Sequence, residues 1–166
     1  MDIEPATPPG SSREELARGV HDALLGRAET LGCAESLTGG ELAALLSGTP
    51  GASGWFRGGV VGYATEVKRQ LLGVTAAQVV SADCAAQMAT GVRSLLEVDW
   101  ALSATGVAGP DRQEGKPVGM VYLALAGPRQ VRTSRLALSG DRRQIRAASC
   151  LAALELLLQE VGRDHD

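Results

Sequence analysis

Short apolar segments alternate with longer segments of helical periodicity along the chain, and this alternation constrains the fold more than any other feature. Strands are expected at 32–35, 60–63, 100–105, 118–126 and 131–138. Helices are expected at 13–29, 40–47, 65–72, in a segment that Ser81 or Asp83 can cap, and at 141–161. Strands between helices, with one hairpin at 118–138, predict an α/β fold, a three-layer α/β/α sandwich with a mixed sheet.

The 166 residues of the chain suit one domain of ordinary size. Residues 1–12 are rich in proline and are expected to form a flexible N-terminal segment, so the domain itself is expected at 13–162. At this boundary Ser12 and Glu15 have the spacing of a capping box, in which each side chain satisfies the main-chain amide of the other residue.

Acidic residues outnumber basic ones by 19 to 16, for a formal net charge of −3. This balance argues against a general nucleic-acid binder, because such binding depends mainly on Lys and Arg at phosphates. No apolar run reaches the roughly 18 residues that a membrane helix needs, and residues 1–4 lack the basic start of a signal peptide. Three cysteines without a CxxC pair favour a reducing compartment, so a cytoplasmic protein is predicted.

Histidine is scarce, and this limits the kinds of catalytic and metal site that the chain can form. The two histidines are His21, within a helical segment, and His165, next to the C-terminus. A Ser-His-Asp triad or a His-rich metal site is therefore not expected. Proton transfer in an enzyme built on this chain would fall to a lysine, a tyrosine or a carboxylate.

The loops 35–40 and 105–110 follow expected strands, and ligands of such folds bind at this edge of the sheet. In the first loop Ser36 lies between a strand and a helix, where a serine can expose its hydroxyl. Gly39 and Gly40 allow main-chain amides to approach a phosphate or an oxyanion closely. Taken alone, the segment is also typical of a helix N-cap, in which a hydroxyl binds the first amides.

A second candidate pair is Tyr63, at the end of a strand, and Lys68, in the helix that follows. Both side chains could point into one cleft at the strand ends. A lysine acts as a general base only when burial or a nearby cation lowers its pKa from about 10.4. The alternative is a surface Lys68 paired with Glu66, beside a packed Tyr63.

Two further segments could bind an anion. The turn from Gly106 to Gly109 follows Thr105 at the end of an apolar strand, and its main-chain amides could surround an anion. At the start of the last helix, Asp141 is a predicted N-cap and Arg142 could form a forked contact with a phosphate or carboxylate. An ordinary tight turn and a solvated first helical turn are the alternatives.

These motifs occur in one order along the chain. The stretches are 34–40 (AESLTGG), 58–63 (GGVVGY), 66–68 (EVK), 71–74 (LLGV), 105–110 (TGVAGP), 116–119 (KPVG) and 140–142 (GDR). Their joint order and spacing resemble the C-terminal domain of the competence/damage-inducible CinA proteins, the nicotinamide-nucleotide amidase family. The resemblance extends over residues 13–161.

The resemblance implies hydrolysis of a small-molecule substrate, nicotinamide mononucleotide, to nicotinate mononucleotide and ammonia, without a metal or other cofactor. It implies Ser36 as the nucleophile, Lys68 as its base, and Tyr63 as a residue that assists proton transfer or orients the pair. The residues expected to hold the oxyanion through main-chain amides are Thr38, Gly39 and Gly40. The residues expected to bind the 5′-phosphate are Thr105, Gly106, Gly109 and Arg142.

The sequence also departs from the pattern of that family. Leu37 stands where the family more often has cysteine, Thr65 stands where asparagine is more common, and the loop 111–115 is unusually charged. The alternative function is a non-catalytic nucleotide- or partner-binding module of a competence or DNA-damage response, and a third is an amidase for another substrate. An edge strand at 131–138 could pair between the subunits of a homo-oligomer.

Overall fold

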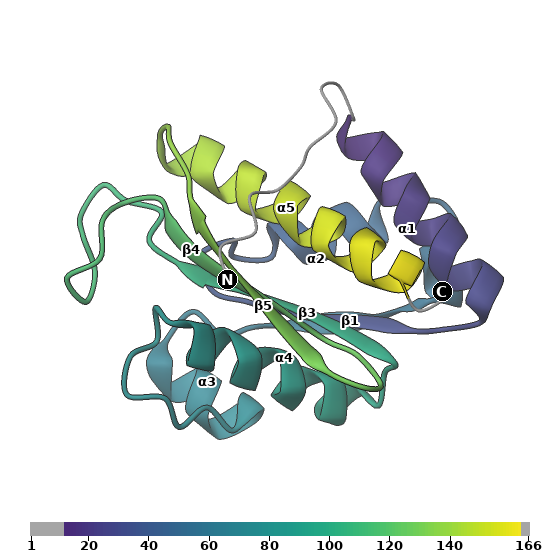
Figure 1. Cartoon of the computed structure of the whole chain (residues 1–166), viewed down its shortest axis with the longest axis horizontal. Coiled ribbons are helices and arrows are strands. Elements are labelled where there is room, and N and C mark those ends of the chain that lie inside the picture. The colour runs from purple at the N-terminus through teal and green to yellow at the C-terminus, as the bar shows by residue number, and fades with distance from the viewer. Residues whose placement is uncertain (1–11, 164–166) are drawn as a thin grey trace.

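A five-stranded mixed sheet organises the computed structural model, which describes residues 12–163 (Figure 1). The strands are β1 (Leu31–Glu35), β2 (Phe56–Val61), β3 (Trp100–Gly106), β4 (Met120–Ala126) and β5 (Val131–Ala137). The α-helices are α1 (Arg13–Arg27), α2 (Glu41–Ser47), α3 (Thr65–Leu72), α4 (Ala82–Leu96) and α5 (Arg142–Arg163), and a 3₁₀ helix, η1, spans Ala52–Gly54. The predicted α/β fold with a mixed sheet is confirmed. Of the expected flexible segment 1–12, all but Ser12 lies outside the described residues, as does His165.

The strand order is β2-β1-β3-β4-β5. β1 runs parallel to both β2 and β3, whereas the pairs β3–β4 and β4–β5 are antiparallel. The carboxyl ends of β1, β2 and β3 therefore meet at one edge of the sheet. This edge brings together the segments that follow residues 35, 61 and 106.

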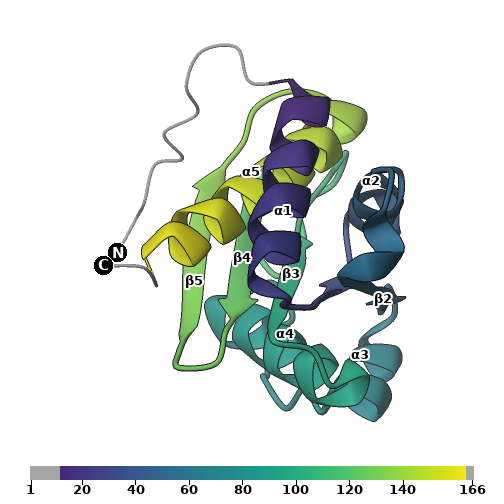
Figure 2. The ribbon, with the colours of Figure 1, turned by 90° about the vertical axis from the view of Figure 1, so that its right-hand side faces the viewer.

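Helices cover both faces of the sheet. Helices α1, α2 and α5 lie on one face, and α3 and α4 lie on the other (Figures 1 and 2). On the first face, Leu24 and Leu154 belong to a core that includes Leu102. On the second face, Met88 and Val92 pack in a cluster with Ala34 of β1. Because both faces are covered, β1 is buried along its whole length.

Local signals in the sequence place several helix ends correctly. Ser12 and Glu15 form the expected capping box, with Glu15 N donating to Ser12 Oγ at 3.2 Å and Ser12 N donating to Glu15 Oε2 at 2.7 Å. Ser81, one of the two predicted caps of α4, accepts from Cys84 N at 3.1 Å.

None of the helices within residues 12–163 combines the length and apolar character that a membrane-spanning helix needs.

Strand β2 differs from its prediction, because it covers Phe56–Val61 instead of 60–63. Gly58 and Gly59 were expected to precede the strand, but both lie within it. A Cβ on Gly59 would lie 2.6 Å from Cys33 Sγ of the neighbouring strand. The glycine therefore allows β1 and β2 to pack at this position and does not break the strand.

Candidate active site

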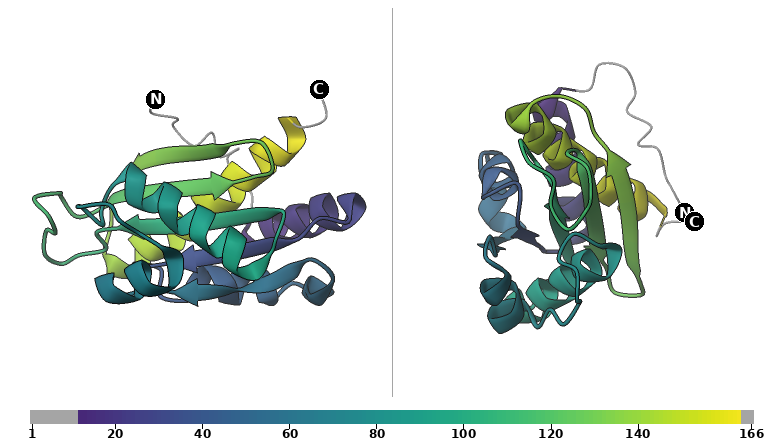
Figure 3. Two further views of the ribbon diagram at one scale, coloured as in Figure 1. Left: turned by 90° about the horizontal axis from the view of Figure 1, so that it is seen from below. Right: turned by 90° about the vertical axis from the view of Figure 1, so that its left-hand side faces the viewer.

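A cavity of about 200 Å³ opens at the carboxyl ends of β1, β2 and β3. It is lined by Ser36, Leu37, Tyr63, Thr65, Lys68, Val79, Val80, Thr105, Gly106, Val107, Ala108, Gly109, Asp111, Gln113 and Arg142. The loop between β3 and β4, which contributes residues 107–109, 111 and 113, extends past the end of the sheet (Figure 3). Most of the residues predicted for the site line this cavity, whereas Thr38, Gly39 and Gly40 do not.

Ser36 is the first residue after β1, so the central part of the sheet fixes its main chain. Its amide donates to the carbonyl oxygen of Ala104 in β3 at 3.0 Å. The residue is half-buried, and its hydroxyl makes no hydrogen bond to any residue of the described chain. A hydroxyl held at a strand end and free of protein partners is available to a ligand in the cavity.

The turn after Ser36 is held by Glu35, whose side chain is fully buried. Its carboxylate accepts from the amides of Gly40 at 3.2 Å, Leu42 at 2.8 Å and Ala43 at 3.0 Å. These are amides at the start of α2, where a carboxylate is favoured by unpaired N–H groups. Glu35 therefore acts as the cap of α2, a role that the sequence analysis did not assign.

The main-chain amides that are left unpaired in this turn are not the ones that were predicted. Gly40 N donates to Glu35, and Gly39 N donates to the carbonyl of Ser36 at 3.0 Å. Both glycine amides are therefore occupied. Within residues 12–163, the amides of Leu37 and Thr38 donate to no protein acceptor, and Leu37 lines the cavity. The unpaired donors of the turn thus lie one to two residues after Ser36.

Arg146 of α5 holds the same turn from the opposite side. Its Nη2 donates to the carbonyl of Thr38 at 3.0 Å. A Cβ on Gly39, where φ is +58°, would lie 3.2 Å from this Nη2, so a larger residue would disturb the contact. Thr38 itself is fully buried and its hydroxyl finds no partner among the described residues.

Lys68 lies on α3 with only 2% of its surface exposed. Its Nζ donates to the main-chain carbonyl of Tyr63 at 3.2 Å. Burial lowers the pKa of Lys68 from its ordinary value, and the carboxylates of Glu114 and Glu66 oppose this effect in part. Burial thus favours the neutral amine, which is the form that a general base requires.

The structure places Ser36 and Lys68 in the walls of one cavity. No hydrogen bond joins their side chains within residues 12–163, and the recorded bond of the Lys68 amine is the one to Tyr63 O. Catalytic hydrogen bonds are often long in a protein without substrate, so this arrangement is compatible with a nucleophile and its base.

Tyr63 and Arg142 meet at the mouth of the cavity. Arg142 Nη2 donates to the Tyr63 hydroxyl at 2.6 Å, and Arg142 Nη1 donates to the carbonyl of Gly109 at 2.6 Å. The Tyr63 side chain is not packed in the core, since the residue is 59% exposed. Arg142 therefore bridges the loops that follow β2 and β3.

Thr105 and Gly106, the last residues of β3, line the cavity together with Gly109 of the loop that follows. The hydroxyl of Thr105 donates to the carbonyl of Val79 at 2.6 Å and is buried. A Cβ on Gly106 would lie 2.7 Å from Met120 O, so glycine permits the approach of β4. The amides of Ala108 and Gly109, two residues that line the cavity, donate to no acceptor in residues 12–163.

Val79, Val80 and Glu114 were not among the residues expected at the site. Val79 and Val80 line the cavity, and the carboxylate of Glu114 accepts from both of their amides at 2.9 Å. The position of the two valines beside the cavity could not be predicted from hydrophobic periodicity, because both lie in an irregular segment before α4. The charged loop 111–115 was the one available signal.

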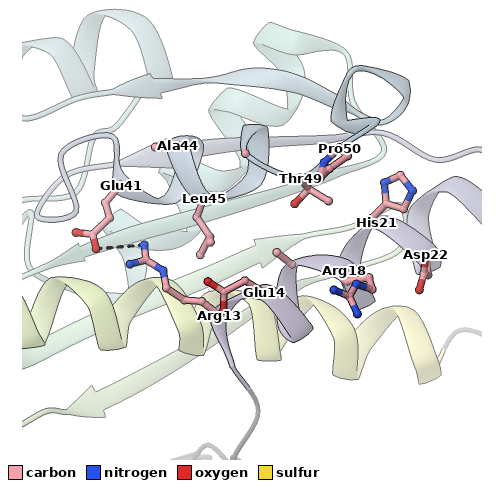
Figure 4. A pocket seen from close by; sticks show the side chains of 12 residues that line it. Arg13, Glu14, Arg18, His21, Asp22, Glu41, Ala44, Leu45, Thr49 and Pro50 are labelled. Atoms are coloured by element: carbon pink, nitrogen blue, oxygen red, sulfur yellow. Dashed lines mark ion pairs between the residues drawn. The ribbon is translucent and has the colours of Figure 1, made fainter.

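A larger groove of about 710 Å³ lies between α1 and α2 (Figure 4). Arg13 forms an ion pair with Glu41 across it at 3.6 Å. His21 lies at the other end and accepts a hydrogen bond from Trp55 Nε1 through Nδ1 at 2.9 Å. The lining of this groove contains no serine, cysteine or lysine, so the smaller cavity carries the candidate chemistry. In the described part of the chain, no three His, Cys, Asp or Glu side chains gather as a metal site.

The chain is similar to known proteins of one family. A family model described as the CinA C-terminal domain matches residues 13–161. A CinA-like protein of Frankia casuarinae is 48% identical over 153 residues, which are 89% of this chain and 35% of that protein. A CinA-like protein of a Cyanothece strain is 46% identical over 160 residues, which are 92% of this chain and 38% of that protein. The chain thus spans little more than a third of these relatives.

Solved structures share the fold over nearly their whole length. The crystal structure of the competence damage-inducible protein A from Klebsiella pneumoniae matches with a TM-score of 0.88 and 34% identity, covering 92% of this chain and 98% of that one. The competence/damage inducible protein of Agrobacterium tumefaciens matches with a TM-score of 0.85 and 32% identity, with coverages of 92% and 98%.

Proposed function

The chain belongs to the CinA C-terminal domain family, and from that premise we propose that it is an amidase that hydrolyses nicotinamide mononucleotide to nicotinate mononucleotide and ammonia. The reaction needs a nucleophile, a base and donors for an oxyanion. Ser36, Lys68 and the amides of Leu37 and Thr38 are assigned to these three tasks.

One observation carries the proposal. Ser36 and Lys68 line the same cavity, and Lys68 is 2% exposed with a lowered pKa. A buried lysine without a carboxylate partner is costly, so its presence beside an unpartnered serine hydroxyl favours a catalytic use of both. A surface lysine paired with Glu66, the alternative considered from the sequence, does not fit this burial.

In the first half of the proposed reaction, the neutral amine of Lys68 takes the proton of the Ser36 hydroxyl while Oγ attacks the carboxamide carbon. The carbonyl oxygen becomes an oxyanion that accepts from the amides of Leu37 and Thr38. Each such donor typically contributes about 3–4 kcal/mol to the transition state. The Lys68 ammonium then gives its proton to the amide nitrogen, the C–N bond breaks, and ammonia leaves a nicotinoyl ester on Ser36.

In the second half, water attacks the ester carbon and its proton passes to Lys68. The bond between the ester carbon and Ser36 Oγ breaks, and Lys68 returns the proton to Oγ. The products are the free serine and the carboxylic acid, which loses its remaining proton to water to give the carboxylate, so Lys68 acts first as base and then as acid in each half.

The small size of the cavity indicates that only part of the substrate lies inside it. Sites that enclose a whole ligand usually measure roughly 300–1,000 Å³, and this cavity measures about 200 Å³. The pyridine carboxamide is therefore assigned to the interior and the phosphate to the mouth. There Arg142 is exposed, and the unpaired amides of Ala108 and Gly109 offer further donors.

The test is ammonia release by the purified chain from nicotinamide mononucleotide, nicotinamide riboside, nicotinamide and the dinucleotide. The wild type should prefer the mononucleotide, and Ser36→Ala should lose at least about 10³-fold in kcat with an unchanged circular dichroism spectrum. Ser47→Ala is the matched control, since Ser47 is exposed on α2 and, among residues 12–163, its hydroxyl bonds only to Ala44 O.

The outcomes separate the candidate functions. Turnover that persists in Ser36→Ala would exclude this nucleophile. Binding of the mononucleotide without ammonia release by the wild type would identify a non-catalytic binding module. Preference for another amide would keep the mechanism and replace the substrate.

A further inference from the structure

The loop between β3 and β4 is fastened to the segment before α4 by one carboxylate. Glu114 Oε1 accepts from Val79 N and Glu114 Oε2 accepts from Val80 N, both at 2.9 Å. Glu114 itself has φ of +51°, a left-handed conformation that is uncommon outside glycine. An unfavourable backbone conformation at the residue that makes both bonds indicates that the contact fixes the loop.

This contact lies against the cavity wall. Val79 and Val80 line the cavity together with Lys68, and the Thr105 hydroxyl holds Val79 from the other side through its carbonyl. The Glu114 carboxylate is therefore separated from the cavity by the two residues whose amides it binds. A second contact of the same loop, from Lys116 Nζ to Gln78 Oε1 at 2.8 Å, lies on the exposed side.

The titratable groups that act on the Lys68 amine come from three elements. Cys84 belongs to α4, Glu114 to the loop, and Glu66 to α3, while Asp111 and Arg142 also line the cavity. Burial raises the pKa of the Cys84 thiol to about 11, so this group is uncharged at neutral pH. Glu114 and Glu66 are then the carboxylates that stabilise the ammonium form, and of the two Glu114 has the larger effect.

We propose that Glu114 is a positioning residue for the base: its carboxylate fixes the loop over the cavity through the amides of Val79 and Val80, behind the cavity wall that these residues share with Lys68. The proposal rests on the proposed function for its catalytic consequence. Its physical part, the link between Glu114 and the Lys68 amine, is independent of any substrate.

The composition of the chain makes this link directly measurable. Lys68 and Lys116 are the two lysines of the sequence, so protein labelled with ¹⁵N and ¹³C at lysine gives two side-chain signals, which Lys116→Arg assigns. In Glu114→Gln the titration midpoint of Lys68 should fall by about half a pH unit or more, because a stabilising negative charge is lost. In Glu114→Asp, which keeps the charge, it should return toward the wild-type value.

Gln78→Ala is the matched control, because it breaks the exposed contact of the same loop without a change of charge. An unchanged Lys68 midpoint in this variant, with a shift in Glu114→Gln, supports the proposal. No shift in Glu114→Gln, or an equal shift in Gln78→Ala, overturns it.

Activity adds a second readout. The acidic limb of kcat/KM reports the base of the free enzyme, so it should move to lower pH in Glu114→Gln by the amount seen in the titration. A wild type that releases no ammonia, with the Lys68 signal still shifted by Glu114→Gln, would reject the proposed function and retain the link between Glu114 and Lys68.

Discussion

Arg142 donates to the hydroxyl of Tyr63 over 2.6 Å although 79 positions separate the two residues in the sequence. The second arm of the guanidinium reaches Gly109 O, so one side chain joins the start of α5 to the loops after β2 and β3. This bridge stands at the mouth of the cavity, where the proposed substrate would place its phosphate. A guanidinium already fixed by two acceptors loses little freedom when it binds an anion.

Arg142→Ala is expected to raise KM for nicotinamide mononucleotide by about tenfold or more, with a much smaller change in kcat, because a charge-assisted contact to phosphate is worth roughly 1.5–3 kcal/mol. Nicotinamide riboside, which lacks the phosphate, serves as the control substrate. Steady-state kinetics on both substrates makes the comparison, and equal losses of kcat/KM for the two would contradict the phosphate role.

Tyr63→Phe distinguishes two roles of the tyrosine. The contact between Tyr63 and Lys68 uses the main-chain carbonyl, which phenylalanine retains. The hydroxyl contacts Arg142 and belongs to a side chain that is 59% exposed. We therefore expect kcat to fall by less than about tenfold and KM to rise as Arg142 loses an acceptor. A loss of kcat by about 10³-fold would instead assign proton transfer to the Tyr63 hydroxyl.

Glu35→Ala is expected to destabilise the fold by about 3 kcal/mol, because three amides at the start of α2 lose a buried acceptor. The turn that carries Ser36 is held by the same carboxylate, so activity should fall as well. Urea unfolding and ammonia release measure the two effects.

Glu15→Ala is the comparison for this prediction. Glu15 also caps a helix, but its contact with Ser12 is exposed and lies outside the cavity lining. A loss of about 1 kcal/mol or less, with full activity, is expected for this variant. If Glu35→Ala unfolded at the same urea concentration as Glu15→Ala, the buried carboxylate would not be the support of the turn.

Much of the fold could be predicted because local signals and tertiary packing agree. The helix Thr65–Leu72 was expected with these bounds, and the strand Trp100–Gly106 was expected to within one residue. The start of β2 could not be predicted, since the meaning of Gly59 depends on Cys33 in another strand. A glycine required by a neighbour and a glycine that ends a strand look alike in sequence.

The candidate site, like the fold, could be predicted from the sequence only in part. Ser36, Tyr63, Lys68 and Arg142 were all expected, and the structure places them around one cavity. The glycine amides of the Ser36 turn were expected to be free, yet Gly40 is bound by Glu35. Such side-chain contacts cannot be predicted from the periodicity of the sequence. They join residues several positions apart in a turn, as Glu35 does, or residues of two different loops, as Glu114 does.

Lys68→Met is expected to stabilise the protein against heat at neutral pH. Burial lowers the pKa of Lys68 in the folded state relative to about 10.4 in the unfolded chain. Below the folded pKa both states carry the proton, and the folded state bears the full cost of a buried charge. Between the two pKa values the unfolded chain binds a proton that the folded protein has lost, so wild-type stability rises with pH through this window.

The advantage of Lys68→Met should therefore be largest at low pH and shrink as the pH approaches about 10. A gain of about 1 kcal/mol would raise the melting temperature by roughly 2–4 °C for a domain of this size. Melting curves of the two proteins across this pH range provide the measurement, with Lys116→Met, which removes the lysine of the β3–β4 loop, as the control. If the difference in melting temperature between Lys68→Met and the wild type were the same at every pH, the amine would carry no buried charge. The proposal that burial lowers the pKa of Lys68 so that it can act as a base would then be wrong.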